Sequence, residues 1–384
     1  MIYLDNAATT TVLKNSAEAA NKAYSEYFLN PSALYKNADG VRLQIDAARK
    51  TIAELLCAEP NEIYFTSGAT EANNWAVLGG LKKKNLAAVS SLGEHASVHE
   101  SFTLLNSKGI DVNFAKLCLD TSVDAENLLK IAAKDCGFVS LIHASNETGV
   151  INDIGEIFRV IKKQNPNVVV HSDGVQAFGK VNTDVDKLHV DLYSISGHKV
   201  GAPKGIGALY IRKGLKIQPL ICGGGQERGL RSGTENVPGV LAFAVAATHY
   251  KNVYRKQADN FKVLRKYFFE YVSENAGNIV LNGKAADIGE YMPNILSISV
   301  VGIRAEILQR VLADEENILI GLGSACAASK KGNRVLQAAG KSMSEIEGNI
   351  RISFGIETTQ EEVETAARIM VKRIKELRGK QNGR

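Results

Sequence analysis

The chain has 384 residues, of which 45% are hydrophobic and 23% are charged, and its formal net charge at pH 7 is +5. This composition is typical of globular proteins, and the length allows two domains with separate cores. No apolar run is long enough to cross a bilayer, and the first residues lack the features of a secretory signal, so we expect a cytoplasmic protein with no membrane partner. The basic runs lack interleaved aromatic residues, so we expect solvated helix faces rather than direct nucleic-acid binding.

The spacing of the cysteines argues against metal and disulfide chemistry. The five cysteines stand at positions 57, 118, 136, 222 and 326, and no two of them form a Cys-x-x-Cys pair. Neither a zinc site nor a disulfide framework is predicted, and we expect no bound metal. The first three cysteines lie in apolar surroundings and are expected to pack as small hydrophobic residues.

Short apolar runs alternate with segments of helical periodicity from about residue 45 to about residue 250. A helix is predicted over residues 71–78, and the predicted strands cover residues 63–66, 87–90, 137–142, 167–172, 190–196 and 208–211. This alternation indicates an α/β fold built of βα units with a mostly parallel sheet. Ligands of such sheets bind beyond the carboxyl ends of the strands, where several polar residues of this chain fall.

The pattern changes at about Asn252. A long charged helix is predicted to begin there, and the segments after it are a strand at 295–300, a helix at 306–312, a Gly/Ser loop, a strand at 350–353 and an amphipathic helix at 361–377. This succession predicts a smaller α+β domain. We therefore divide the chain into a large domain, residues 15–250, and a small domain made of residues 1–14 and 251–384, which carries a mobile loop at about 321–333.

Lys199 is the first candidate for chemistry. It follows the predicted strand 190–196, within Ser194-Ile195-Ser196-Gly197-His198-Lys199. A lysine at the end of a buried strand loses its proton more easily and becomes an amine nucleophile, as a Schiff base to pyridoxal phosphate requires. The alternative is an exposed loop lysine, and this interpretation is favoured when Lys199 is considered alone.

Three more strand ends carry candidate residues. Thr66-Ser67-Gly68-Ala69-Thr70-Glu71 leads into a helix whose N-terminus offers N–H groups to an anion, although simple capping by Thr70 is the alternative. Asp173 follows another strand, where a carboxylate needs a partner such as a protonated pyridine nitrogen; its alternative is to cap the next helix. His95 could stack on a planar cofactor and move protons, and its alternative is a structural histidine.

Two residues of the second part complete the candidates. Cys326 lies among small residues, from Gly321 to Ser329, which bury little apolar surface and are therefore predicted to be mobile. A cysteine on such a loop could move between a site and a partner, or be an incidental thiol. Arg351 lies in a predicted strand and is a planar clamp for a carboxylate, or else part of a surface ion pair.

Taken together, these segments resemble the cysteine desulfurases of the class V aminotransferase fold. The resemblance runs in order over almost the whole chain, and it rests on residues 3–10, 66–71, 94–95, 146–149, 196–199, 202–205, 231–236 and 323–326. It implies the pyridoxal-phosphate-dependent transferase fold type I, with a mostly parallel seven-stranded sheet in the large domain. It also implies pyridoxal 5'-phosphate as the cofactor, L-cysteine as the substrate and a homodimer.

The resemblance implies catalytic roles for Lys199, Cys326 and His95, and contacts with the cofactor ring for Asp173 and Gln176. Lys199 would carry the cofactor and take the Cα proton of L-cysteine. Cys326 would accept the sulfur as a persulfide while L-alanine leaves. Asp173 would pair with the pyridinium nitrogen, Gln176 with the ring hydroxyl oxygen, and His95 would lie over the ring.

The remaining roles implied by the resemblance concern binding. The groups that would hold the phosphate come from two strand ends and, for the last residue, from a second subunit: Ala69, Thr70, Ser196, His198 and Thr234. Asn146 and Arg351 would bind the substrate carboxylate. A sulfur-acceptor protein is implied as a further partner, either an iron–sulfur scaffold or a tRNA-thiolation carrier.

The chain departs from the family pattern at two places. Members often have a Leu-Glu-Pro-like stretch soon after the loop cysteine, where this chain has Lys330-Lys331-Gly332-Asn333, and residues 30–36 replace a usual Asn-Pro-Ser-Ser segment. Because of both departures, the identity of the sulfur acceptor stays open. The alternatives within this fold are a selenocysteine lyase, a transaminase or another enzyme. The alternative of another class is a non-catalytic sulfur-carrier or assembly protein.

Overall fold

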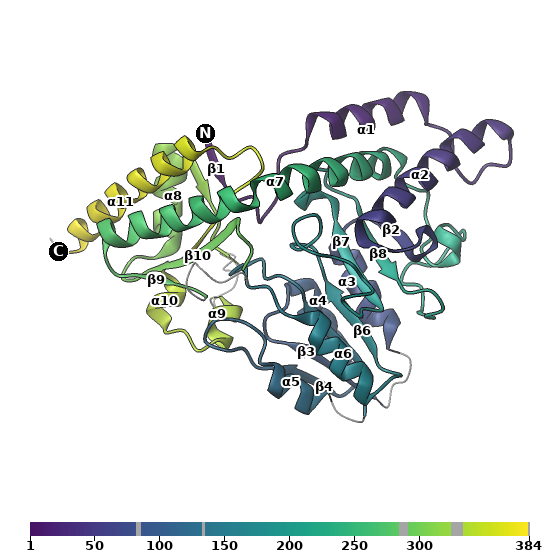
Figure 1. Ribbon diagram of the computed structural model, residues 1–384, viewed down its shortest axis with the longest axis horizontal. Coiled ribbons are helices and arrows are strands. Elements are labelled where there is room, and N and C mark those ends of the chain that lie inside the picture. The colour runs from purple at the N-terminus through teal and green to yellow at the C-terminus, as the bar shows by residue number, and fades with distance from the viewer. Residues whose placement is uncertain (82–85, 133–134, 284–290, 324–332, 383–384) are drawn as a thin grey trace.

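A seven-stranded sheet forms the centre of the computed structural model, which describes residues 1–384 except 82–85, 133–134, 284–290, 324–332 and 383–384 (Figure 1). In sheet order the strands are β2 (Ile63–Thr66), β8 (Gly207–Ile211), β7 (Leu192–Ser196), β6 (Val169–Asp173), β5 (Cys136–Ile142), β3 (Ala87–Ser91) and β4 (Val112–Ala115). β8 runs antiparallel to both of its neighbours, and the other pairs are parallel. The predicted α/β fold with a mostly parallel seven-stranded sheet is confirmed.

Apolar side chains cover both faces of this sheet. Neighbouring residues of a strand point to opposite faces, so Phe138 packs with Trp75 on one face while Val139 packs with Phe158 on the other. The helices of this part are α1 (Lys14–Glu26), α2 (Asp39–Leu56), α3 (Ala69–Gly80), α4 (Ala96–Ser107), α5 (Ala125–Ile131), α6 (Ile154–Gln164) and the first half of α7 (Val237–Ala276). Since both faces are buried, the strands are nearly continuous apolar runs.

Two smaller sheets lie in the other part of the molecule (Figure 1). One is antiparallel, in the order β12 (Asn349–Ser353), β10 (Ile295–Val300) and β9 (Ile279–Leu281), and in the other β1 (Ile2–Leu4) pairs in parallel with β11 (Ile318–Ile320). The helices here are α8 (Ala305–Glu316), α9 (Arg334–Ala338), α10 (Met343–Glu347) and α11 (Gln360–Asn382). The N-terminal strand thus lies beside segments from the end of the chain, although the domain boundaries at 14/15 and 250/251 stay predictions.

The long helix begins earlier than its charge pattern predicted. α7 starts at Val237, not near Asn252, because Asn236 caps it by accepting a hydrogen bond from the backbone N–H of Gly239. Its first turns are mostly apolar and buried, so they lack the charged face that marks the rest. α7 packs against α1 and α2 in one part and against α11 in the other. Within the described residues, no helix has the length and apolar character of a membrane span.

A buried ion pair holds the segment before α7 against the sheet. The guanidinium of Arg49 on α2 binds the carboxylate of Glu227 through two hydrogen bonds of 2.7 and 2.8 Å, and both side chains are buried. Glu227 also accepts from the backbone N–H of Phe65 on β2, at 3.0 Å. The short 3-10 turns of the chain are η1 (Lys36–Ala38), η2 (Pro60–Glu62), η3 (Gly197–Lys199) and η4 (Glu227–Gly229). The turn η4 is therefore fixed beside β2, the strand that leads into α3.

We predict that Arg49→Met lowers the free energy of unfolding by about 3–5 kcal/mol, because it leaves the carboxylate of Glu227 buried without its cation. The matched change Arg159→Met breaks an exposed pair with Glu156, which water screens, and should leave the free energy of unfolding nearly unchanged. Urea unfolding of both variants measures the difference. Equal losses in the two variants would contradict the prediction.

Candidate active site

A cavity of about 1200 Å³ lies at the carboxyl ends of the central strands. Ten predicted site residues line it, and they come from the ends of β2, β3, β5, β6 and β7 and from β12: Ala69, Thr70, His95, Asn146, Asp173, Gln176, Ser196, His198, Lys199 and Arg351. The structure thus brings together residues that are up to 282 positions apart, as Ala69 and Arg351 are. Within the described residues, no group of three or more His, Cys, Asp or Glu side chains is arranged to hold a metal ion.

Lys199 ends the 3-10 turn that follows β7. Its Nζ donates hydrogen bonds to the backbone carbonyls of Ala7 and Ala8, at 2.7 and 2.5 Å. Burial, with the nearby cation of Arg351 as a smaller cause, lowers the pKa of Lys199 from 10.5 to about 8. The amine is therefore neutral in a large fraction of molecules at mildly alkaline pH, as a nucleophile requires.

The turn between β2 and α3 can receive an anion. Gly68 is the N-cap of α3, and no side chain caps the helix there, so the predicted alternative of capping by Thr70 is wrong. β8 passes directly beneath this turn: a Cβ on Gly207 would lie 2.8 Å from Cα of Gly68, so glycine permits the close approach. The first N–H groups of a helix have no intrahelical acceptor and are left for a ligand.

Two polar side chains stand opposite this turn. The buried hydroxyl of Ser196 has no hydrogen-bond partner among the described residues. His198 contacts the hydroxyl of Thr9 at 3.2 Å. Burial, assisted by neighbouring lysines, lowers the pKa of His198 to about 4, so its ring is neutral at pH 7 and can act there through hydrogen bonds rather than charge.

A chain of hydrogen bonds joins Asp173 to His95. Asp173 is 3% exposed and accepts from the side-chain amide of Asn73 at 2.7 Å and from the backbone N–H of Val175 at 3.0 Å. Asn73 also donates to the hydroxyl of Ser97 at 2.9 Å, and Nδ1 of His95 accepts from the backbone N–H of Ser97 at 3.1 Å. Nδ1 is therefore an acceptor, which in the neutral ring leaves the proton on Nε2.

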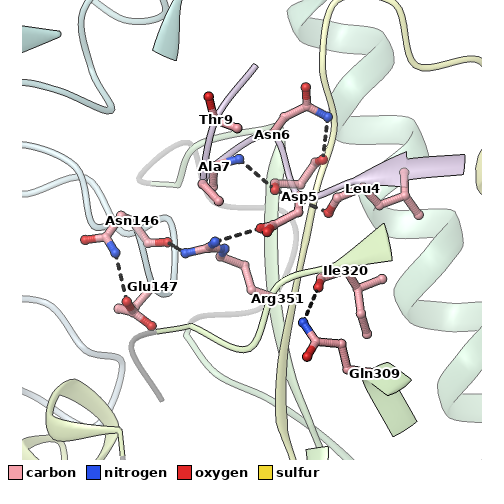
Figure 2. A network of polar contacts seen from close by, with 12 residues as sticks. Leu4, Asp5, Asn6, Ala7, Thr9, Asn146, Glu147, Gln309, Ile320 and Arg351 are labelled. Carbon is pink, nitrogen blue, oxygen red and sulfur yellow. Dashed lines mark hydrogen bonds and ion pairs between the residues drawn. The ribbon is translucent and has the colours of Figure 1, made fainter. Parts of the chain in front are cut away.

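Arg351 lines the cavity and is held between Asp5 and Asn146 (Figure 2). Its guanidinium donates to a carboxylate oxygen of Asp5 at 2.8 Å and to the backbone carbonyl of Asn146 at 2.7 Å. Arg351 is 5% exposed, so the alternative of a surface ion pair is wrong. Its Nε is buried without a hydrogen-bond partner in the part of the chain that the structure describes.

Two predicted residues remain: one lies away from the cavity and the other falls outside the described residues. Thr234 is exposed and lies outside the cavity of its own chain, in the segment between η4 and α7. Cys326 and most of the predicted 321–333 loop lie outside the described residues. The structure therefore leaves the roles of Thr234 and Cys326 as predictions.

The sequence reasoning missed four residues that shape the site. They are Asp5, Asn73, Glu94 and Glu147, and each is a polar group tied to a predicted site residue or its neighbour. Glu94 accepts from Ser91 and from the backbone N–H of Ile142, and burial raises its pKa to about 8. The available signal was a polar residue close to apolar ones, as with Asn73, which follows Ala72 and stands two positions before Trp75.

The comparisons with known proteins agree with this geometry. Residues 2–365 match the family described as Aminotransferase class-V. The chain therefore belongs to the class-V aminotransferases and, within them, to the cysteine desulfurases. A relative from Dictyoglomus turgidum, named cysteine desulfurase IscS, is 36% identical over 381 residues, which cover 98% of this chain and 95% of the relative.

Two solved structures show the same arrangement of the chain. One, described as a NifS-like protein, has a TM-score of 0.90 and 33% identity, and the match covers 97% of this chain and 99% of that one. The other, described as SspA in complex with cysteine, has a TM-score of 0.80 and 31% identity over 94% of this chain and 100% of that one. The fold type expected from the sequence is confirmed.

We predict that the amine of Lys199 in the cofactor-free protein titrates near pH 8. Limited acetylation with acetic anhydride, quantified by mass spectrometry at a series of pH values, measures this because only the neutral amine reacts. Arg351→Gln should raise the midpoint, since it removes a cation that disfavours the charged amine, and Asp5→Asn should lower it, since it removes an anion that favours the charged amine. A midpoint near 10.5, or shifts in the same direction, would be the contrary result.

Proposed function

We propose that this chain is a cysteine desulfurase that depends on pyridoxal 5'-phosphate. It takes the sulfur of L-cysteine, releases L-alanine and keeps the sulfur as a persulfide on Cys326 for transfer to an acceptor. The observation that carries the proposal is one cavity in which the amine of Lys199, the carboxylate of Asp173 and the guanidinium of Arg351 converge. The naming of the Dictyoglomus relative and the cysteine bound to SspA support it.

The residues present fit the proposed cofactor. The carboxylate of Asp173, oriented by two donors, would accept a hydrogen bond from a protonated pyridine nitrogen. The hydroxyl of Ser196, which has no partner in the part of the chain that the structure describes, and the N-terminus of α3, at Ala69 and Thr70, would hold the phosphate. When bound, the cofactor draws electrons away from the substrate Cα and so makes its proton easier to remove.

Three other residues would complete the cofactor site. Gln176 would contact the ring hydroxyl, and its amide nitrogen already donates to the carbonyl of Ala7 at 2.9 Å, which orients it. His95 would lie over the ring, with its Nδ1 held by Ser97. The imidazole of His198, which is neutral at pH 7, would form a hydrogen bond with the phosphate.

The protein groups then divide the chemistry between them. Arg351 and Asn146 would bind the substrate carboxylate, and the amine of Lys199 would hold the Cα proton. The thiolate of Cys326 attacks the substrate sulfur, so an S–S bond forms as the Cβ–S bond breaks. The electron pair of the broken bond stays on the substrate carbon, which takes up a proton and becomes the methyl group of alanine. L-Cysteine and a thiol thus give L-alanine and a persulfide without any external oxidant.

The proposal extends to the assembly and its partners. The protein would act as a homodimer in the cytoplasm, and Thr234 of each chain would reach the phosphate of its partner's site, because it is exposed and does not line its own. The large domain, residues 15–250, would bind the cofactor, and residues 1–14 and 251–384 would carry the sulfur-accepting cysteine. The acceptor would be an iron–sulfur scaffold or a tRNA-thiolation carrier.

We predict that the protein loaded with pyridoxal phosphate converts L-cysteine to L-alanine in the presence of a thiol reductant. Lys199→Ala should lower alanine formation by at least about a thousandfold, since it removes the amine that moves the proton. Cys326→Ala should retain the visible absorbance of the bound cofactor but form no protein persulfide. Amino-acid analysis and mass spectrometry measure the two products.

Three results would count against this function. Alanine formation by the Lys199→Ala variant at the wild-type rate would show that another group does the chemistry. Persulfide transfer by the Cys326→Ala variant would show that another thiol accepts the sulfur. A purified protein that takes up no cofactor would instead favour the non-catalytic alternative.

A further inference from the structure

One carboxylate lies between the two described ends of the segment that contains Cys326. Glu147 is 3% exposed, and its Oε2 accepts a hydrogen bond from the side-chain amide of Asn333 at 3.0 Å. A Cβ on Gly323 would lie 2.2 Å from the same oxygen, so the backbone of Gly323 is packed against it. Residues 323 and 333, which flank the segment in the sequence, therefore meet at one oxygen atom.

The other oxygen of Glu147 binds Asn146, which lines the cavity (Figure 2). Oε1 accepts from the side-chain amide of Asn146 at 2.8 Å. The backbone carbonyl of Asn146 accepts from Arg351 at 2.7 Å. A single side chain thus connects the flanks of the cysteine segment to the two residues proposed to bind the substrate carboxylate.

The two flanking residues suit this contact. Asn333 is fully buried, and its Oδ1 caps α9 by accepting from the backbone N–H groups of Val335 and Leu336, so its amide nitrogen is directed to Glu147 and, at 3.3 Å, to Asn349. Gly323 has a φ of +65°, which favours glycine, and a side chain there would collide with Glu147. Bringing the ends of a chain segment together removes much of its conformational freedom.

We propose that Glu147 is a positioning residue for sulfur transfer, which clasps both flanks of the Cys326 segment and sets the thiol's reach toward the bound substrate. The inference rests on the proposed function, because it assigns Cys326 as the acceptor. The carboxylate of Glu147 also favours the charged form of the Lys199 amine. Its contribution through Asn333 and Gly323 falls on the step in which Cys326 attacks sulfur.

The test uses Asn333→Asp in the cofactor-loaded protein. Aspartate retains the cap of α9 but turns the amide that faces Glu147 into a second carboxylate, so attraction becomes repulsion. Two rates are measured: persulfide formation on Cys326 in a single turnover with L-cysteine, by mass spectrometry, and exchange of the Cα hydrogen of L-alanine with deuterium from the solvent, by NMR. The exchange needs Lys199 and the cofactor but no loop thiol.

We expect Asn333→Asp to slow persulfide formation about tenfold or more while hydrogen exchange stays within about twofold of the wild type. Gly323→Ala, which attacks the clasp from the other flank, should act in the same direction. Glu156→Gln, which removes an exposed carboxylate from α6, is the matched control and should leave both rates unchanged.

The double variant Glu147→Gln with Asn333→Asp supplies a rescue. The new glutamine can still accept from Asn146 through its oxygen and can donate to the new aspartate through its nitrogen, so the hydrogen bonds are restored with reversed polarity. Persulfide formation in the double variant should exceed that of Asn333→Asp and return to within about threefold of the wild type, although the contact of Asn333 with Asn349 is lost.

Several outcomes would overturn the inference. They are a wild-type rate of persulfide formation in Asn333→Asp, a parallel fall of both rates together with the melting temperature, and a double variant no faster than Asn333→Asp. A wild-type protein that exchanges the alanine hydrogen but forms no persulfide on Cys326 would refute the proposed acceptor instead. The two failures are therefore distinguishable.

Discussion

The ion pair between Arg351 and Asp5 is the contact on which the arrangement of the site depends. A guanidinium that is 5% exposed would be costly to bury alone, so it recruits partners from distant segments. Asp5 follows the N-terminal strand, Arg351 lies on β12, and the carbonyl of Asn146 comes from the loop after β5. The guanidinium of Arg351 thus connects β12 and the segment after the N-terminal strand to the central sheet at the wall of the cavity.

Burial also keeps basic groups in and near the cavity from being fully charged; His198 and Lys199 line it, and Lys180 lies within electrostatic range of both. Burial, with smaller contributions from neighbouring cations, lowers the pKa of Lys180 to about 7, of Lys199 to about 8 and of His198 to about 4. An anion that enters such a site reduces the mutual repulsion of the cations. The same surroundings therefore favour the binding of a phosphate and the presence of a neutral amine, which a lysine in water could not provide at pH 7.

The sequence predicted the sheet and most of the cavity because both follow local rules. Apolar runs marked the strands, and polar residues at strand ends, such as Asp173 and Lys199, marked the site. The partners that orient these residues were out of reach, since Asn73 and Asp5 act through contacts across 100 and 346 positions. The start of α7 was misplaced for a related reason: its first turns are buried, and a charged face is a sign of exposure only.

Helix α7 spans both parts of the molecule as one continuous element. Its 40 residues amount to about 60 Å of helix, and it packs against α1 and α2 at one end and α11 at the other. A rotation of the two parts relative to each other would have to bend or break backbone hydrogen bonds along this rod. The scaffold around the cavity is consequently stiff against a hinge motion between the two parts.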